Sequence, residues 1–355
     1  MKLLISGVCG FVGSSLARCL REAMPEAAVT GFDNFARPGS EMNRLALAEC
    51  GVKVHHLDAR AASDMAVLPE ADWVIDAAAM PSVLAGVDGR SSSRQLLEHN
   101  LGSTINLLEY CKERKAGFVL LSTSRVYSIP PLAGLAVTPL RNAFTPDADA
   151  GFPRGLSALG INEHFSTEPP VSLYGSTKIA SEVLALEYGS TFGFPVWINR
   201  CGVMAGAGQF GHPEQGIFSF WINSWLRRAP LKYIGFGGTG CQVRDCMHPR
   251  DLLPLLRRQF SATDGKMPRL VNLGGGVENS MSLAQLSEWC AARFGPHDVG
   301  ADPKPRPFDL PWVVLDHSLA TRTWQWRPQT PIASVLEEIA VHAAQHPEWL
   351  KVSKP

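Results

Sequence analysis

Three glycines near the start of the chain separate a short apolar run from a segment with helical spacing. Lys2–Ser6 is typical of a buried strand, and Phe11–Met24 repeats apolar residues at helical intervals. Gly7, Gly10 and Gly13 lie at the junction. A strand that passes through closely spaced glycines into a helix is the first half of a βαβ unit, because glycine lets the backbone turn tightly. The beginning of the chain therefore predicts an α/β fold with a parallel sheet.

The same alternation of strand and helix continues to about residue 200. Further strands are predicted at Ala28–Phe32, Val52–Leu57, Trp73–Ala77, Phe118–Ser122 and Phe194–Asn199, with helices at Leu101–Cys111 and Tyr174–Tyr188. This pattern predicts a Rossmann-type doubly wound parallel sheet in a domain spanning residues 1–203. Residues 128–170, rich in Pro, Gly and Ala, interrupt it as a loop excursion. Residues 204–355 are expected to form a smaller, mixed lobe whose segments interleave with the first domain.

Charge and cysteine content exclude several classes of function. The chain contains 33 basic and 33 acidic residues, and a formal net charge of +0 gives no broad attraction to nucleic acid or anionic lipid. No apolar run approaches the ~18 residues needed to cross a membrane. The eight cysteines include no C-x-x-C pair and are expected to be reduced, buried thiols. We therefore expect a cytoplasmic protein with no nucleic-acid partner, no membrane association and no metal site.

Asp33 indicates what the glycine loop binds. The loop by itself is also compatible with a tight turn that has no ligand. Asp33 ends the second predicted strand, 20 residues after Gly13. A carboxylate there accepts hydrogen bonds from the adenosine ribose hydroxyls and repels a 2′-phosphate, so the loop is predicted to bind NAD. Arg37 lies near enough to keep NADP as an alternative, and Asp58 is placed either to meet the adenine edge or to cap a helix.

Tyr174 and Lys178 form a candidate catalytic pair at the start of a predicted helix. Their i, i+4 spacing places both side chains on one face of that helix. Tyrosine, with an ordinary pKa near ~10, is a weak base, but a nearby lysine and a cationic nicotinamide favour the phenolate. Thr123 follows a predicted strand and can orient a reacting hydroxyl toward Tyr174, although hydroxyl clusters at strand ends are also common turn formers. The pair gains its significance from its position after the glycine loop and Asp33.

With these residues in place, the chain resembles the extended short-chain dehydrogenase/reductase family of nucleotide-sugar epimerases and dehydratases. The resemblance runs through Gly7-x-x-Gly10-Phe11-Val12-Gly13, Asp33-Asn34, Asp58, Ala77-Ala78-Ala79, Asn100, Ser122-Thr123, Tyr174-x-x-x-Lys178, Asn199-Arg200, Arg244-Asp245 and Arg306-Pro307-Phe308-Asp309. It implies cofactor contacts from Gly7, Gly10, Phe11, Val12, Asp33, Asn34, Asp58, Ala59, Ala77, Ala78, Asn100, Tyr174 and Lys178. It also implies Thr123, Tyr174 and Lys178 as catalytic residues, and a homodimer.

The family places the nucleotide of its substrate against the second lobe. The implied substrate-binding residues are Ser124, Asn199, Gln209, Gln215, Arg244, Arg306 and Asp309. Arg244 and Arg306 are expected to clamp the diphosphate through planar guanidinium groups, and Asp309 to meet the nucleotide ribose. A surface ion pair is the alternative for each arginine, and Asn199 can equally belong to a structural hinge.

Within the family, two stretches resemble the CDP-paratose 2-epimerases. They are Ala207–Gly211 with Glu214–Gly216, and Gly237–Asp245. Related dehydratases carry an Asp-Glu pair, which elimination requires, where this chain has Ser124 and Arg125. The expected reaction is therefore NAD-dependent epimerisation of a nucleotide-diphosphate sugar at C2, with a CDP-sugar as substrate. A 4-epimerase, a net NAD-dependent sugar oxidoreductase and a non-catalytic NAD-binding regulator are the alternatives.

Overall fold

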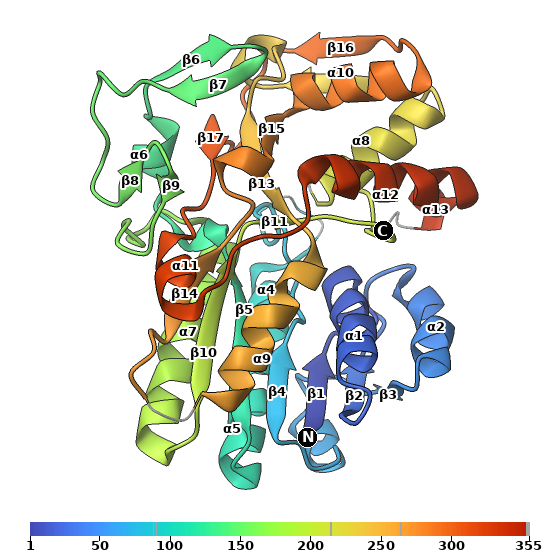
Figure 1. The fold of residues 1–355 in the computed structure, drawn as a ribbon, viewed down its shortest axis with the longest axis vertical. Helices are drawn as coiled ribbons and strands as arrows, with labels where there is room; N and C mark the ends of the chain where they lie inside the picture. The colour runs from blue at the N-terminus through green and yellow to red at the C-terminus, as the bar shows by residue number, and fades with distance from the viewer. Residues whose placement is uncertain (88, 90, 214, 263–264, 353–355) are drawn as a thin grey trace.

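A seven-stranded parallel sheet forms the larger of two lobes, the lower one in Figure 1. The computed structural model describes residues 1–87, 89, 91–213, 215–262 and 265–352. In spatial order the strands are β14 (Leu270–Leu273), β10 (Val196–Cys201), β5 (Gly117–Thr123), β4 (Trp73–Asp76), β1 (Lys2–Ser6), β2 (Ala28–Asp33) and β3 (Lys53–His56). The six strands predicted in the first 203 residues are confirmed, and β14 is an addition from the second half of the chain. The chain order reverses between β1 and β4, which opens a crevice at the carboxyl ends of the strands.

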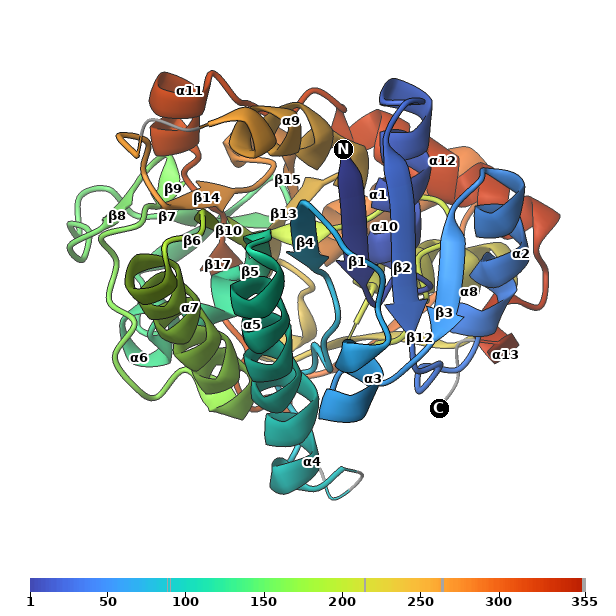
Figure 2. The same ribbon diagram turned by 90° about the horizontal axis from the view of Figure 1, so that it is seen from below.

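Helices cover both faces of this sheet (Figure 2). One face carries α1 (Phe11–Ala23), α2 (Asn43–Glu49), α9 (Leu253–Ser261) and α11 (Ser318–Trp324), and the other carries α3 (Ala62–Ala66), α4 (Ser93–Leu97), α5 (Ser103–Arg114) and α7 (Ser172–Phe192). Leu3 and Ile5 belong to the buried cluster on the α1 face, whereas Leu4 belongs to the cluster on the α5 and α7 face. Because successive strand side chains point to opposite faces, a strand covered on both sides is apolar throughout.

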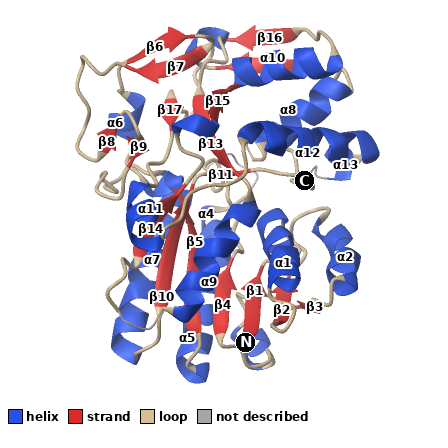
Figure 3. Ribbon diagram, viewed as in Figure 1, coloured by secondary structure: helices blue, strands red, loops and turns tan. Residues whose placement is uncertain are grey.

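A small mixed sheet organises the second lobe (Figure 3). Its central strand β13 (Val243–Met247) pairs with β11 (Val203–Met204), β15 (Ser280–Ser282) and β17 (Trp312–Val313). The lobe is completed by the ladder of β12 (Leu231–Ile234) with β16 (Val299–Asp302) and by α8 (Ile217–Leu226), α10 (Leu283–Phe294), α12 (Ile332–Gln345) and α13 (Trp349–Val352). Trp221, Trp225, Trp324 and Trp326 are all buried, so the role of these aromatic residues is to fill the cores.

Residues 128–170 contain more order than the predicted loop excursion. They form α6 (Ile129–Ala133) and two hairpins, β6 (Val137–Leu140) with β7 (Ala143–Pro146) and β8 (Leu156–Ser157) with β9 (Gly160–Ile161). Strands of two to four residues are too short to show a periodic pattern in the sequence. The segment is anchored to the second lobe, since the Ile161 amide donates to the Val314 carbonyl at 2.8 Å.

The chain crosses between the lobes more than once after residue 203. Strand β14 and helices α9 and α11 all come from residues 204–355, yet they pack on the large sheet of the first lobe. The site described below is therefore built from segments far apart in the sequence.

Most of the cysteines are buried, but two of them are not. Six cysteines are buried, Cys19 is half-buried, and Cys50 is exposed, which corrects the expectation that all the thiols are buried. Within the described ranges no disulfide forms and no group of side chains is arranged to hold a metal ion. Among the same residues, no helix combines the length and apolar character that crossing a membrane requires.

Candidate functional site

The glycine loop joins β1 to α1 in a conformation that side chains would prevent. Gly7 has a φ of +63°, and a Cβ atom there would lie 2.9 Å from the Ala78 Cα. A Cβ atom at Gly13 would lie 2.2 Å from the Gly7 carbonyl oxygen. Gly10 precedes α1 without any side-chain cap, so the N–H groups of the first turn remain available to an anion. This geometry fits the diphosphate of a dinucleotide.

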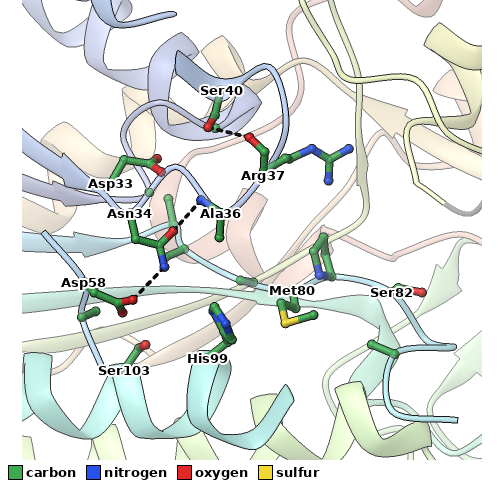
Figure 4. A pocket seen from close by; sticks show the side chains of 18 of the residues that line it. Asp33, Asn34, Ala36, Arg37, Ser40, Asp58, Met80, Ser82, His99 and Ser103 are labelled. Atoms are coloured by element: carbon green, nitrogen blue, oxygen red, sulfur yellow. Dashed lines mark hydrogen bonds between the residues drawn. The ribbon is translucent and has the colours of Figure 1, made fainter. Parts of the chain in front are cut away.

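A cavity of about 440 Å³ lies beside this loop, above the ends of β1 and β2 (Figure 4). Of the predicted cofactor residues, Gly7, Gly10, Asp33, Asn34, Asp58, Ala59, Ala77 and Ala78 line it. The Asp33 carboxylate accepts hydrogen bonds from the backbone N–H groups of Cys9, at 3.0 Å, and Phe35, at 2.8 Å. Burial raises the pKa of Asp33, and these backbone donors oppose the rise.

Asp58 and Asn34 form the far wall of the same cavity. The Asn34 amide donates to Asp58 at 3.1 Å and also accepts from the Ala36 N–H (Figure 4). Burial acts against ionisation of Asp58, but hydrogen bonds from Arg60 and Asn34 outweigh it and lower the pKa of Asp58 to about 2. The wall therefore presents fixed acceptors to a nucleoside, and the cavity fits the adenosine half of NAD.

A second cavity, of about 330 Å³, continues from the first toward β5 and α7. Gly10, Arg37 and Gln215 line both cavities, so the two are adjacent parts of one groove. The predicted residues that line the second cavity are Phe11, Val12, Thr123, Ser124, Tyr174, Lys178, Gln209 and Gln215. All three predicted catalytic side chains therefore meet in one place.

Tyr174 and Thr123 lie together in this cavity. Tyr174 lies in the first turn of α7, Thr123 ends β5, and both residues line the cavity. Burial raises the pKa of Tyr174 to about 12, against the opposing effects of Thr123 and the charge of Arg125. The buried Lys178 ammonium donates to the Leu121 carbonyl at 3.2 Å. A positive charge placed beside Tyr174 would favour its phenolate form.

A buried polar network supports the strand ends beneath the catalytic cavity. Ser122 donates to Glu182, which also forms an ion pair of 2.6 Å with Arg200. Arg200 donates to the Tyr127 hydroxyl at 3.3 Å, and Tyr127 donates to the Asn272 side chain at 2.6 Å. Despite its burial, Arg200 keeps a pKa above the ordinary value because of Glu182. The network links β5, α7, β10 and β14, which together position Thr123 and Tyr174.

Neither Asn100 nor Asn199 lines either of the two cavities, and direct binding by these residues stays a prediction. Asn100 is buried and exchanges hydrogen bonds with the backbone of Met80, a residue that does line the first cavity. Asn199 is fully buried. Its side-chain amide both donates a hydrogen bond to the Gln259 side chain and accepts one from it. Both asparagines therefore act within the fold, Asn100 by holding the Met80 loop and Asn199 by joining β10 to α9.

The predicted diphosphate residues lie beyond the rim of the catalytic cavity. Arg244 pairs with Asp309 at 3.0 Å, and Asp309 also accepts from Gln242 at 3.3 Å. Arg306 is half-buried near Gly235. These residues do not line the two cavities themselves. They are nevertheless near neighbours of Arg125, which lines the catalytic cavity.

The sequence indicates a role for Arg37 only in relation to NADP, and it indicates none for His99. Arg37 donates to Gln215 at 2.6 Å and lies 5.1 Å from the Phe210 ring, so it spans the groove between the lobes. His99 lines the adenosine cavity from the α4–α5 side. Neither position belongs to a recognisable motif, and only the tertiary structure places it. Glu214, part of the stretch that resembles the 2-epimerases, lies outside the described residues.

The fold and this groove define a dinucleotide-dependent enzyme of the Rossmann type. The profile described as "NAD dependent epimerase/dehydratase family" matches residues 3–274, and the chain belongs to this family. NAD is accordingly its cofactor, and the glycine loop with Asp33 fits that ligand.

Relatives in this family differ in reaction. CDP-paratose 2-epimerase of Salmonella typhi is 28% identical over 298 residues, covering 81% of this chain and 82% of that protein. UDP-glucuronate 4-epimerase of Thermodesulfobacterium geofontis is 24% identical over 363 residues, covering 99% and 98%. Among solved structures, UDP-glucose 4-epimerase of Bifidobacterium longum with NAD+ and UDP superimposes with a TM-score of 0.78 at 19% identity, covering 98% of this chain and 100% of that one. The similarity shows the shared fold and the family, within which these relatives differ in the carbon that they invert.

Proposed function

We propose that this enzyme is an NAD-dependent nucleotide-sugar epimerase that acts at C2 of a CDP-sugar. The observation that carries the proposal is that Thr123, Tyr174 and Lys178 line one cavity, and that this cavity adjoins the dinucleotide cavity. Ser124 and Arg125 occupy the two positions after Thr123, so the acid pair needed for elimination is missing there. The similarity to the CDP-paratose 2-epimerase of Salmonella typhi supports the choice of substrate.

The proposed reaction uses Tyr174 as the base. Thr123 orients the reacting hydroxyl of the sugar, and the Tyr174 phenolate removes its proton. NAD, when bound, supplies the acceptor and then the donor of one hydride. The ketosugar turns within the cavity and presents its opposite face, and Tyr174 returns the proton to the same oxygen. Lys178, whose ammonium donates to the Leu121 carbonyl, lies four residues after Tyr174 on the same helix, and its positive charge favours the phenolate.

Isotope labelling tests the proposal. The purified protein should carry NAD and should interconvert a CDP-sugar with its C2 epimer without added cofactor. In heavy water the inverted carbon should stay free of deuterium, because the hydride returns to the carbon that it left. Deuterium at that carbon would instead show enolisation and refute hydride return. A Tyr174→Phe variant should keep NAD but lose turnover.

Epimerisation at C4 is the second candidate function. The UDP-glucuronate 4-epimerase of Thermodesulfobacterium geofontis aligns with nearly the whole chain, farther than the 2-epimerase does. Analysis of the product from a panel of CDP- and UDP-sugars decides between the two positions. Accumulation of NADH in proportion to product would select a net oxidoreductase over either epimerase.

We further propose that the protein is a cytoplasmic homodimer. Leu97, Leu173 and Val183 belong to α4 and α7, two helices in contact, and expose 44%, 37% and 61% of their surface. A second copy of the chain would cover them. Sedimentation analysis should give twice the chain mass for the wild type, and Val183→Glu should shift it toward the monomer.

A further inference from the structure

Arg125 places an unpaired cation in the catalytic cavity. It lies in the single helical turn Ser124–Val126 directly after β5, and it lines the cavity together with Thr123 and Tyr174. In the described part of the chain, its guanidinium forms no hydrogen bond or ion pair. By contrast, the buried Arg200 is fully engaged by Glu182. Arg125 is half-buried, and an unpaired guanidinium at the wall of a cavity favours an anionic ligand there.

The backbone of Arg125 is fixed relative to the catalytic tyrosine. Its N–H donates to the Thr123 hydroxyl oxygen at 3.1 Å. Its carbonyl packs so tightly against Gly175 that a Cβ atom there would lie 2.3 Å from the oxygen. Because Gly175 directly follows Tyr174, the start of the Arg125 side chain is held at the first turn of α7. An anion bound by Arg125 would therefore be close to the Tyr174 hydroxyl.

Two more arginines increase the positive charge at this point. Arg244 and Arg306 from the second lobe are electrostatic neighbours of Arg125, as are Asp309 and Tyr174. Asp309 is already engaged by Arg244 at 3.0 Å. The other charged groups that act on Arg125 are therefore two arginines and a single carboxylate. Burial, followed by repulsion from Arg244, lowers the pKa of Arg125 to about 10, which is the sign of a cation in a positive environment.

We propose that Arg125 binds the phosphate that carries the sugar, and thereby determines which ring carbon is oxidised. The inference rests on the proposed function and deepens it. The sugar-bearing phosphate is bonded through oxygen to the anomeric carbon, C1. C2 is the neighbour of C1, whereas C4 lies across the pyranose ring. A phosphate held beside Tyr174 by Arg125 places C2 at the tyrosine and holds C4 away from it.

The guanidinium group suits this task because its planar N–H groups can bind two phosphate oxygens at once. Arg244 and Arg306 then hold the rest of the diphosphate from the second lobe. A carboxylate on the sugar, as in a uronic acid, is also an anion that a guanidinium group binds. The experiment must therefore distinguish the phosphate from a sugar carboxylate.

Binding of nucleotides to the NAD-loaded full chain tests the inference. The probes are CDP and UDP, each compared with its monophosphate, in isothermal titration. Arg125→Gln should weaken binding of the diphosphate by about tenfold or more and leave the monophosphate unchanged, because a hydrogen bond to a charged group is lost. Arg125→Lys should retain most of the preference for the diphosphate. Arg154→Gln, which removes an exposed arginine, is the matched control and should change neither.

Three results would overturn the inference. Equal affinity losses for diphosphate and monophosphate, or no loss for either, would show that Arg125 does not bind the second phosphate. A loss confined to UDP-glucuronate, with UDP-glucose and UDP unaffected, would assign Arg125 to a sugar carboxylate. Failure of the wild type to bind any of these nucleotides would overturn the proposed function as well, so the two failures are distinguishable.

Discussion

Removal of the Glu182 carboxylate should destabilise the protein strongly, because it leaves the Arg200 cation buried without a partner. The two side chains are 4% and 8% exposed and are joined at 2.6 Å. Breaking a buried ion pair from one side costs about 3–5 kcal/mol. With an unfolding entropy of roughly 2.1 cal/mol/K per residue, this loss lowers the melting temperature of a chain of 355 residues by about 4–7 °C. Glu182→Leu is the variant to make, with calorimetry as the assay.

Two further variants make this prediction refutable. Glu98→Gln breaks the exposed Arg94–Glu98 pair, whose side chains are 87% and 47% exposed, and should change the stability by less than about 1 kcal/mol. The double variant Glu182→Leu/Arg200→Met should recover part of the loss, since no charge is then left buried. A Glu182→Leu melting temperature equal to that of Glu98→Gln would refute the reasoning. So would a double variant less stable than Glu182→Leu alone.

Three other predictions concern the groove. The value of kcat/KM should rise with pH, because only deprotonated Tyr174 accepts a proton and burial raises its pKa to about 12. Thr123 lowers this pKa, so Thr123→Val should move the rise of kcat/KM to higher pH, and an unmoved profile contradicts the assignment. Asp33→Ala should weaken NAD binding about tenfold or more and improve NADP binding, as measured by titration. An unchanged ratio of the affinities for NAD and NADP would contradict the contact between Asp33 and the ribose. Arg37→Met removes the 2.6 Å hydrogen bond to Gln215 and should speed the dissociation of NAD about fivefold, as measured by the NAD retained during ultrafiltration. If variant and wild type retain the same amount of NAD, Arg37 does not hold the cofactor in the groove.

The parts of the fold with strong local signals were predictable from the sequence. The six strands of the first half are apolar runs because helices cover both faces of their sheet, and the glycine loop is visible because side chains do not fit there. The short hairpins of residues 128–170 and strand β14 were not predictable. Two to four residues carry too little periodicity, and β14 becomes a strand only by pairing with β10.

The functional site likewise contains residues that local sequence patterns predict and residues that only the tertiary structure places. Thr123, Tyr174 and Lys178 were predictable because their chemistry depends on spacing along β5 and α7, and the structure brings them into one cavity. The pairing of Asn199 with Gln259 could not be predicted, because the two residues are 60 positions apart and no pattern links them. Arg37 crosses 178 residues to reach Gln215, so its place over the groove also requires the tertiary fold.

Strand β14 has a consequence for the biosynthesis of the protein. It pairs with β10 along Ile198–Cys201 and closes that edge of the large sheet. When the ribosome has synthesised residues 1–203, the sheet contains six strands and its β10 edge is still open. That edge can accept a strand from another nascent chain until Leu273 emerges. We expect intermediates truncated before Leu270 to aggregate or to bind chaperones, although they already contain the complete glycine loop and the Tyr174–Lys178 pair.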